Sequence, residues 1–216
     1  MPKHAAQRQM ARTPDPEEEL AALRTEAASC RACPLWRGAT QTVFGEGPVG
    51  ATLMLVGEQP GDQEDRIGRP FVGPAGLLLR RALAEVGIDP DRQYVTNAVK
   101  HFKYLQRGKR RIHQKPNVGE IDICRQRWLF REIELMRPRL VVALGATAAR
   151  ALAGSPVAIG KSRGRVLRQE TPAPVFVTVH PSAVIRIVDE RDRRAAYRQF
   201  ASDLAAAKKL AKGAKG

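Results

Sequence analysis

Four short runs of apolar residues divide the chain, and glycine, proline or polar residues bound each of them. The runs are ATLMLVG (51–57), QYVTNAV (93–99), RLVVALG (139–145) and VFVTV (175–179). A continuous apolar run of this length is typical of a strand buried on both faces, as in a parallel sheet. Helical patterns lie between the runs. The alternation predicts an α/β fold, a three-layer α/β/α sandwich around a central four-stranded parallel sheet.

The helical segments have recognisable boundaries. The first begins after Asp15, with Pro16 at its first position and Glu18 placed for a capping box. Others are expected from Pro74 to Gly87, from 118 to 136, from 147 onward and near the end of the chain, with a hairpin around 164. We expect one domain over 16–204, a disordered segment before it (1–15) and a frayed Lys/Ala-rich tail after it (205–216).

Charge indicates the class of partner. The chain has 37 Lys and Arg against 22 Asp and Glu, a net charge of +15. This balance favours a polyanion, with nucleic acid as the first candidate and a membrane surface as the alternative. No apolar run is long enough to span a membrane, and the start carries no secretory signal. We therefore expect a soluble cytoplasmic protein, monomeric by default.

The stretch RGKRRIHQKP (107–116) combines basic residues with His113. Its breakers and its lack of apolar periodicity predict a surface loop. Between Lys100 and Gly119 there are seven Lys or Arg and no acid. Such a loop can grip phosphates with the histidine incidental, or it can present the imidazole as a reactive group. It also follows the second predicted strand, and the chemistry of parallel α/β folds lies beyond the carboxyl ends of the strands.

The three cysteines form a separate pattern. Cys30 and Cys33 have C-x-x-C spacing, and Cys124 lies early in the helix after the basic loop. In a chain without a signal peptide, this pattern favours metal or redox chemistry over a disulfide framework. A tetrahedral site needs a fourth donor, and free buried cysteines are the simpler alternative.

Four ordered motifs resemble the uracil-DNA glycosylase superfamily, nearest to the iron-sulfur family 4 enzymes. They are GEQPG (57–61), GRPFVGPAG (68–76), TNAVKH (96–101) and HPS (180–182). The sequence KRRIH (109–113) resembles the signature of the UDGX class, whose members are said to capture uracil-containing DNA covalently. The likeness covers about residues 30–200.

The resemblance implies a pocket for a uracil flipped out of the DNA stack. Phe71 would stack on the base and Asn97 would read its edge, an amide pairing that cytosine disturbs. His180 would donate to the developing uracil anion, and Gln59 and the backbone around it would add donors. Without the motifs, Phe71 would be core filling, Asn97 a strand-end cap and His180 a histidine that satisfies backbone groups.

The resemblance also implies a covalent step at His113. The cations of Lys109, Arg110 and Arg111 would disfavour a positive charge on the nearby imidazole and leave it a neutral nucleophile. Glu58 would accept its proton or face the sugar cation; otherwise it is a solvated loop carboxylate. We expect DNA contacts from a set of five residues: Lys109, Arg110, Arg111, Ser182 and Gly73.

For the cysteines, the resemblance implies a [4Fe-4S] cluster held by Cys30, Cys33 and Cys124. Family 4 enzymes typically place a fourth cysteine where this chain has His101. His101 is therefore the expected fourth ligand by position. Zinc is the alternative, because three cysteines and a histidine are equally a zinc pattern.

Together, these expectations describe an enzyme that cleaves uracil from DNA, with single strands preferred, and that traps the deoxyribose C1′ on His113. Two alternatives stay open. One is an ordinary multiple-turnover glycosylase that releases free uracil. The other is a non-catalytic nucleic-acid binder on the same scaffold, which high salt would displace and which would show no preference for uracil.

Overall fold

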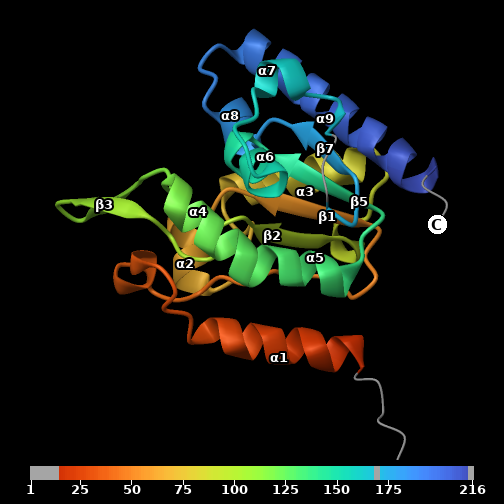
Figure 1. Cartoon of the computed structure of the whole chain (residues 1–216). Coiled ribbons are helices and arrows are strands. Elements are labelled where there is room, and N and C mark those ends of the chain that lie inside the picture. Colours follow the sequence, from red (N-terminus) through yellow and green to blue (C-terminus); the bar gives the residue numbers. More distant parts are fainter. Residues whose placement is uncertain (1–14, 168–170, 214–216) are drawn as a thin grey trace, which may run out of the picture.

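The computed structural model describes residues 15–167 and 171–213. Its central sheet has the strand order β2-β1-β5-β7-β6 (Figure 1). The four predicted strands are confirmed and run parallel: β1 (Leu53–Gly57), β2 (Tyr94–Asn97), β5 (Leu140–Leu144) and β7 (Val175–Thr178). The sheet has a fifth strand beyond the four expected, β6 (Val166–Leu167), which pairs antiparallel with β7. Its two residues are too few to give a periodic signal.

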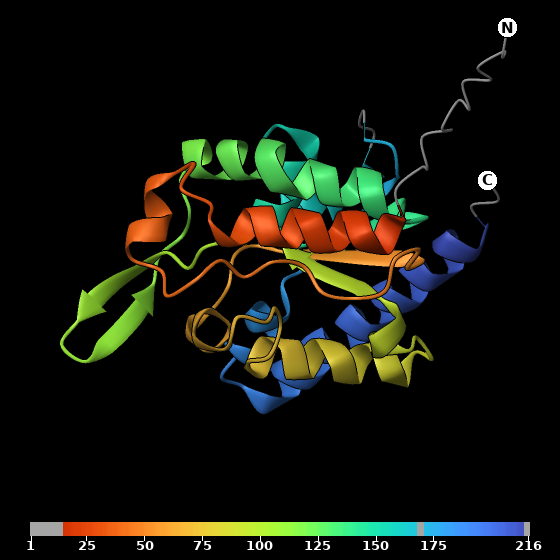
Figure 2. The ribbon, with the colours of Figure 1, turned by 90° about the horizontal axis from the view of Figure 1, so that it is seen from below.

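Helices cover both faces of the sheet, so the three-layer architecture is confirmed (Figures 1 and 2). Successive residues of a strand point to opposite faces. In β1, Met54 and Val56 belong to one apolar core, whereas Leu53 and Leu55 belong to the other. The first core includes residues of α1, α4, α5 and α6, and the second includes residues of α3, α8 and α9.

Most of the predicted helices are present at or near the expected positions. Asp15 caps α1 by accepting from the Glu17 N–H. The segment predicted as one helix from 118 to 136 is helical throughout, with a π-helical turn at Arg125–Leu129. The α-helices are α1 (Pro16–Ala28), α2 (Asp62–Ile67), α3 (Pro74–Glu85), α4 (Val118–Cys124), α5 (Phe130–Met136), α6 (Ala146–Ala153), α7 (Ile159–Ser162), α8 (Pro181–Ile185) and α9 (Glu190–Gly213). Short 3₁₀ turns lie at Pro34–Arg37 and Pro90–Arg92.

The basic stretch is a β-hairpin, so the prediction of a surface loop is wrong. Strands β3 (Tyr104–Arg107) and β4 (Arg110–His113) pair antiparallel around a two-residue turn. Gly108 has a φ of +55°, the left-handed conformation that such turns require. Figure 2 shows the hairpin projecting from the body. Because polar residues occupy both of its faces, the sequence carries little apolar alternation.

Two expectations near the C-terminus need revision. The tail predicted to fray from 205 is part of α9 as far as Gly213, because Ala207 and Ala211 are buried against the second core. Near 164, Gly164 forms a turn with φ +74° before β6, and the antiparallel pairing predicted there is between β6 and β7. The expected disordered segment lies, apart from Asp15, outside the described residues.

Candidate functional site

A pocket of about 790 Å³ opens at the carboxyl ends of the parallel strands. Each central strand contributes one polar or glycine residue to its lining. Glu58 follows β1, Asn97 ends β2, Gly145 follows β5 and His180 follows β7. The pocket therefore lies where the parallel-sheet rule predicts it. His113 of the hairpin also lines it.

Phe71 is held at the pocket in an unusual backbone conformation. Its φ is +55°, which is uncommon for a residue with a bulky side chain. Two glycines make room for it. A Cβ at Gly76 would lie 1.7 Å from the Phe71 carbonyl oxygen, and a Cβ at Gly57 would lie 2.7 Å from the Phe71 ring. Such local strain is typical of functional sites, and here it places an aromatic face in the pocket lining.

His180 lies in the pocket as a neutral imidazole. Its Nδ1 accepts from the Ser182 N–H at 3.2 Å and lies 2.8 Å from the Ser182 hydroxyl. The ring proton therefore lies on Nε2, which is left as a donor. Burial, followed by the electrostatic effects of Arg186 and His113, lowers the pKa of His180 to about 4. The ring of Phe71 lies 6.4 Å from that of His180, with 25° between the planes.

The lowered pKa of His180 predicts a loss of stability in acid. The unfolded state binds a proton near pH 6.5 and the folded state near pH 4. Stability is therefore lost as the pH falls from 6.5 toward 4, by about 2 kcal/mol between pH 7 and pH 5. Urea unfolding at both pH values measures this difference. In His180→Asn the difference should shrink by that amount, while the contribution of the other histidines cancels in the comparison.

Glu58 brings together the hairpin and the helix after β5. Its Oε1 lies 3.4 Å from His113 Nε2, and its Oε2 accepts from the Thr147 hydroxyl. The His113 side chain is 50% exposed and that of Glu58 is 23% exposed. Sequence reasoning missed Thr147, which is buried in the first turn of α6. Its sequence signal was a hydroxyl residue two positions after the third apolar run, 139–145.

The Gln59 side chain holds the base of the hairpin and does not read a ligand. Its amide nitrogen donates to the carbonyls of Lys103 and Gln114, at 3.1 and 3.0 Å, and its carbonyl accepts from the Lys103 N–H. All its hydrogen-bonding groups are therefore used, and only 7% of the residue is exposed. The expected uracil-reading role of this side chain does not fit the geometry. Gln59 nevertheless belongs to the pocket lining.

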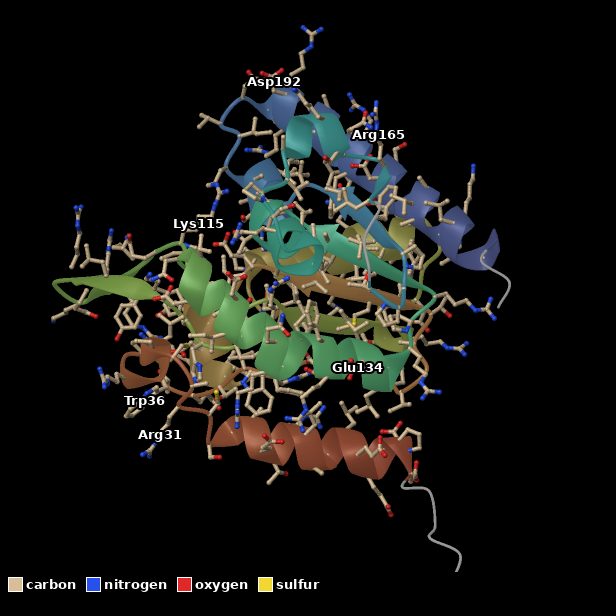
Figure 3. All side chains as sticks on the ribbon, viewed as in Figure 1. Arg31, Trp36, Lys115, Glu134, Arg165 and Asp192 are labelled. Atoms are coloured by element: carbon tan, nitrogen blue, oxygen red, sulfur yellow. The ribbon has the colours of Figure 1, made fainter. Side chains whose placement is uncertain are left out.

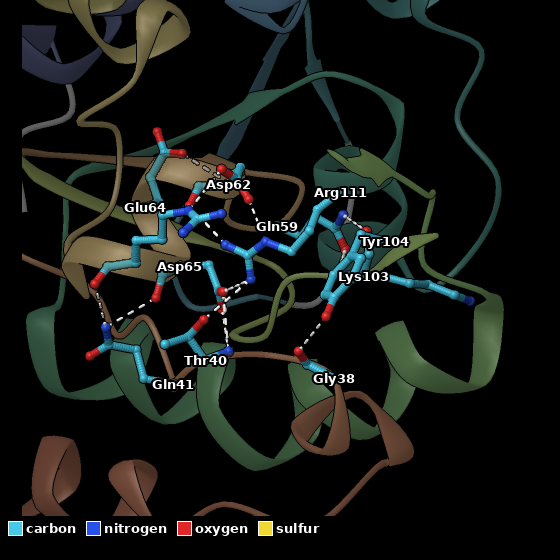
Figure 4. A network of polar contacts seen from close by, with 12 residues as sticks. Gly38, Thr40, Gln41, Gln59, Asp62, Glu64, Asp65, Lys103, Tyr104 and Arg111 are labelled. Atoms are coloured by element: carbon cyan, nitrogen blue, oxygen red, sulfur yellow. Dashed lines mark hydrogen bonds and ion pairs between the residues drawn. The ribbon is translucent and has the colours of Figure 1, made fainter. Parts of the chain in front are cut away.

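Arg111 turns inward, so the expected DNA contact does not fit its position either. Its guanidinium pairs with Asp62 and Asp65 and donates to the Thr40 hydroxyl (Figure 4). The side chain is only 10% exposed, and it lies 5.1 Å from the ring of Tyr104. Because β-strand side chains alternate, His113 lies on the same inward side of the hairpin. Arg111 therefore holds the strand that presents His113.

The other basic residues of the stretch divide into two groups. Lys100 and Lys103 are ion-paired, with Glu132 and Glu120 respectively. The second group is exposed and forms no ion pair within 15–167 and 171–213; its members are Arg107, Lys109, Arg110 and Lys115. Figure 3 labels Lys115. The predicted DNA contacts of Lys109 and Arg110 thus fit their positions.

Ser182 and Gly73 line the pocket, but their polar groups are engaged elsewhere. The N–H and hydroxyl of Ser182 face His180. The Gly73 N–H donates to Glu64, whose other oxygen accepts from the Gly61 N–H. Neither residue is positioned as the phosphate contact that the sequence analysis expects. Glu64, which joins the two glycine-rich loops, was not singled out from sequence.

Cys33 and Cys124 are buried in the first apolar core and Cys30 packs against it, but the expected ligand set is not assembled. Burial raises the pKa of the Cys124 thiol to about 12, and Cys33 and Cys30 lie close enough to add to the rise. The His101 ring has a different partner, with its Nε2 3.0 Å from the Thr42 hydroxyl. Within the described ranges, no group of three or more His, Cys, Asp or Glu side chains is arranged to hold a metal ion. The thiols fit soft-metal chemistry, whereas His101 does not join them.

Most residues of the segment 30–38, which contains the first two cysteines, are exposed, whereas Cys33 and Leu35 are buried. Arg31 lies over the ring of Trp36 at 4.8 Å, and Figure 3 labels both. The indole of Trp128 donates to the Cys30 sulfur at 3.1 Å.

Among the described residues, none of the helices has the length and apolar character needed to traverse a lipid bilayer.

Comparison with known proteins identifies the family. The family model of the uracil DNA glycosylase superfamily matches residues 44–205. A type-4 uracil-DNA glycosylase from Thermotoga maritima is 37% identical over 171 residues, which are 79% of this chain and 85% of that protein. Type-4 enzymes from Sulfurisphaera tokodaii and Archaeoglobus fulgidus are 35% and 34% identical, over 78% of this chain and 76% and 84% of theirs. The chain therefore belongs to the uracil-DNA glycosylase superfamily.

Proposed function

We propose that this protein cleaves uracil from DNA and captures the resulting sugar on His113. Family membership supports the glycosylase chemistry, and the contents of the pocket support the recognition of a flipped base. Phe71 offers a stacking face. The Asn97 amide makes no hydrogen bond to other residues in the described part of the chain, so its donor and acceptor are available to the uracil edge.

Bond cleavage develops opposite charges that the pocket can stabilise. The electron pair of the C1′–N1 bond leaves with the uracil, and positive charge develops on the sugar. The Nε2–H of His180 donates to the base, and the Glu58 carboxylate faces the cation. Because His180 stays neutral above about pH 4, it acts as a hydrogen-bond donor and not as a cation.

The covalent step joins His113 to C1′. A lone pair of the neutral imidazole attacks the anomeric carbon, and the proton on the ring passes to Glu58, 3.4 Å away. The product is an alkylated imidazole. Because neutral imidazole is a poor leaving group, the bond between His113 and C1′ is not readily broken. The observation that carries the proposal is this placement of His113 beside the carboxylate and in the lining of the pocket. The test is a protein–DNA complex that survives denaturation on uracil DNA and is absent on thymine DNA.

An ordinary hydrolase is the second candidate. His113 is half exposed, so water can reach the same pocket. Release of free uracil in molar excess over protein would support this candidate and contradict capture. One uracil released per captured strand supports capture.

We propose uracil-containing DNA as the partner, with single strands preferred because a base outside a duplex needs no unpairing. The aromatic residues at the base of the hairpin, Phe102 and Tyr104, are not available to stack on nucleobases. Phe102 is buried, and the Tyr104 ring stacks on it while its hydroxyl donates to Gly38. We therefore expect the exposed Lys and Arg side chains of the hairpin to bind the DNA phosphates.

Arg111→Met and Arg110→Met should have different effects. Without Arg111 the hairpin loses its contacts to Asp62 and Asp65, so the single-turnover capture rate should fall by about 10- to 100-fold. Without Arg110, affinity should fall and the salt slope of binding should drop by about 1, with the rate at saturating DNA unchanged. Equal effects of the two substitutions on rate and salt slope would contradict this division.

We propose that Cys30, Cys33 and Cys124 hold a structural metal group, a [4Fe-4S] cluster by resemblance or zinc as the alternative. The C-x-x-C spacing and the packing of all three cysteines at one apolar core support this proposal, and the fourth ligand is open because His101 faces Thr42.

Metal analysis of protein purified without oxygen tests the metal group. We expect iron with broad visible absorbance, both lost in Cys124→Ser. Bound zinc in a colourless sample would contradict a cluster, and no metal at all would contradict the site.

A further inference from the structure

Lys100 is a fully buried lysine directly beside the pocket. Its side chain and that of its partner Glu132 are both 0% exposed. Lysine is almost never completely buried unless it is paired. The ion pair between Lys100 and Glu132 lies in the apolar core on the side of the sheet covered by α1, α4, α5 and α6. The pocket chemistry described above does not use this pair.

All three donors of the Lys100 ammonium group are engaged. They reach the Thr96 hydroxyl at 2.6 Å, the main-chain carbonyl of Asn97 at 2.7 Å, and the Glu132 carboxylate. One of the three acceptors therefore belongs to the residue whose side chain faces the base pocket.

Glu132 is itself fixed by several donors. It accepts from the Tyr94 hydroxyl at 2.9 Å, from Thr96 at 3.0 Å and from the Gly45 N–H at 3.2 Å. Burial raises the pKa of Tyr94, and the neighbouring carboxylate raises it further, so the phenol keeps its proton and remains a donor. The counter-ion of Lys100 is thus held rigidly by β2 and by the segment before β1.

The Asn97 side chain depends on its main chain for orientation. Within the described residues its amide has no hydrogen-bond partner, and only 3% of the residue is exposed. The Gly57 position leaves it little room, since a Cβ there would lie 2.3 Å from Asn97 Oδ1. The next two residues bind the end of β1, with Ala98 N–H on the Gly57 carbonyl and Val99 N–H on the Glu58 carbonyl.

The main chain of Lys100 is fixed on both sides as well. Its N–H donates to the Cys124 sulfur at 3.3 Å, and its carbonyl accepts from the Val43 N–H at 2.8 Å. The ammonium group therefore reaches back to Asn97 from a segment that cannot easily shift.

We propose that Lys100 is a positioning residue for base recognition. Its ammonium group fixes the Asn97 carbonyl and thereby aims the Asn97 carboxamide into the pocket, and Glu132 is its buried ion-pair partner. What the aimed carboxamide binds rests on the proposed function, whereas the aiming itself does not. A purely stabilising ion pair would leave Asn97 unchanged when removed.

Nuclear magnetic resonance can observe the aiming directly, because the chain has two asparagines, Asn97 and Asn117. Protein labelled with ¹⁵N at asparagine should give two side-chain amide pairs, and Asn97→Ala identifies one of them. Lys100→Met leaves Glu132 buried and unpaired and can fail to fold, so Lys100→Met/Glu132→Gln removes both charges together. In this double variant we expect the Asn97 signals to shift or broaden. Those of Asn117, which caps α4, should stay in place. Unchanged Asn97 signals would overturn the proposal.

A mutant cycle tests the consequence for chemistry. Under single-turnover conditions on uracil DNA, the Lys100/Glu132 double variant and Asn97→Ala should each slow the reaction by about 10- to 100-fold. Combining them should cost no more than the larger single loss, because both act through one amide. Losses that multiply would show that Lys100 acts independently of Asn97 and would overturn the proposal.

Arg163→Met is the matched control, since it removes another ion pair, with the buried Asp203, outside the pocket lining. It should lower the melting temperature without moving the Asn97 signals. If the wild-type protein does not act on uracil DNA, the proposed function fails, and the Asn97 signals still decide the role of Lys100.

Discussion

Wild-type protein mixed with uracil-containing single-stranded DNA should form a complex that survives boiling in detergent, and His113→Ala should abolish it. The imidazole is the only atom group removed, and it supplies the electron pair of the new bond. The loss should be complete, because alanine has no nucleophile. A denaturing gel with labelled DNA measures the effect.

The same variant should keep the rest of the pocket. Glu58, Asn97 and His180 lie on other segments, so water can attack the sugar cation in place of the imidazole. We expect His113→Ala to leave abasic sites and free uracil. Gln106→Ala is the matched control, because Gln106 lies on the hairpin outside the pocket lining and its side chain donates to the Gly108 carbonyl. A complex that persists in His113→Ala would place the covalent bond elsewhere.

Glu58→Gln should have the second largest effect. The substitution keeps the size of the side chain and its contact to Thr147, but it removes the negative charge that faces the sugar cation. It also removes the acceptor for the His113 proton. Losing one such electrostatic contact typically costs about 10²- to 10³-fold in rate. Single-turnover uracil release and adduct formation should therefore both fall by roughly this factor.

Glu134→Gln is the control for charge, because Glu134 lies on α5 outside the pocket lining. It should behave as wild type. Full uracil release by Glu58→Gln with loss of the adduct alone would restrict Glu58 to the proton transfer. Full activity in both assays would contradict its role.

The fold could be predicted because the four buried strands are continuous apolar runs that alternate with helical patterns, which is typical of a parallel sheet covered on both faces. The hairpin could not be predicted in the same way. Its strands lie outside the core, and Leu105 and Ile112 are its exposed apolar residues, at 50% and 40%. Its structure depends on contacts to residues far away in sequence, such as Arg111 with Asp65.

The site was predicted in part for a similar reason. The strand-end rule located Glu58, Asn97 and His180, which line one pocket. Sequence cannot show which direction a side chain takes, and so Gln59 and Arg111 received ligand roles although both hold the hairpin. The number of basic residues also overestimates how many can bind DNA. Of the seven Lys and Arg between Lys100 and Gly119, three form ion pairs inside the protein.

The most direct test of covalent capture is to map the adduct. Wild-type protein is reacted with a short uracil oligonucleotide, digested with protease and nuclease, and analysed by mass spectrometry. We expect one modified peptide, containing His113, with its added mass equal to the nucleic-acid remnant without the uracil base. Modification of a different residue, or a remnant that still contains the base, would contradict it.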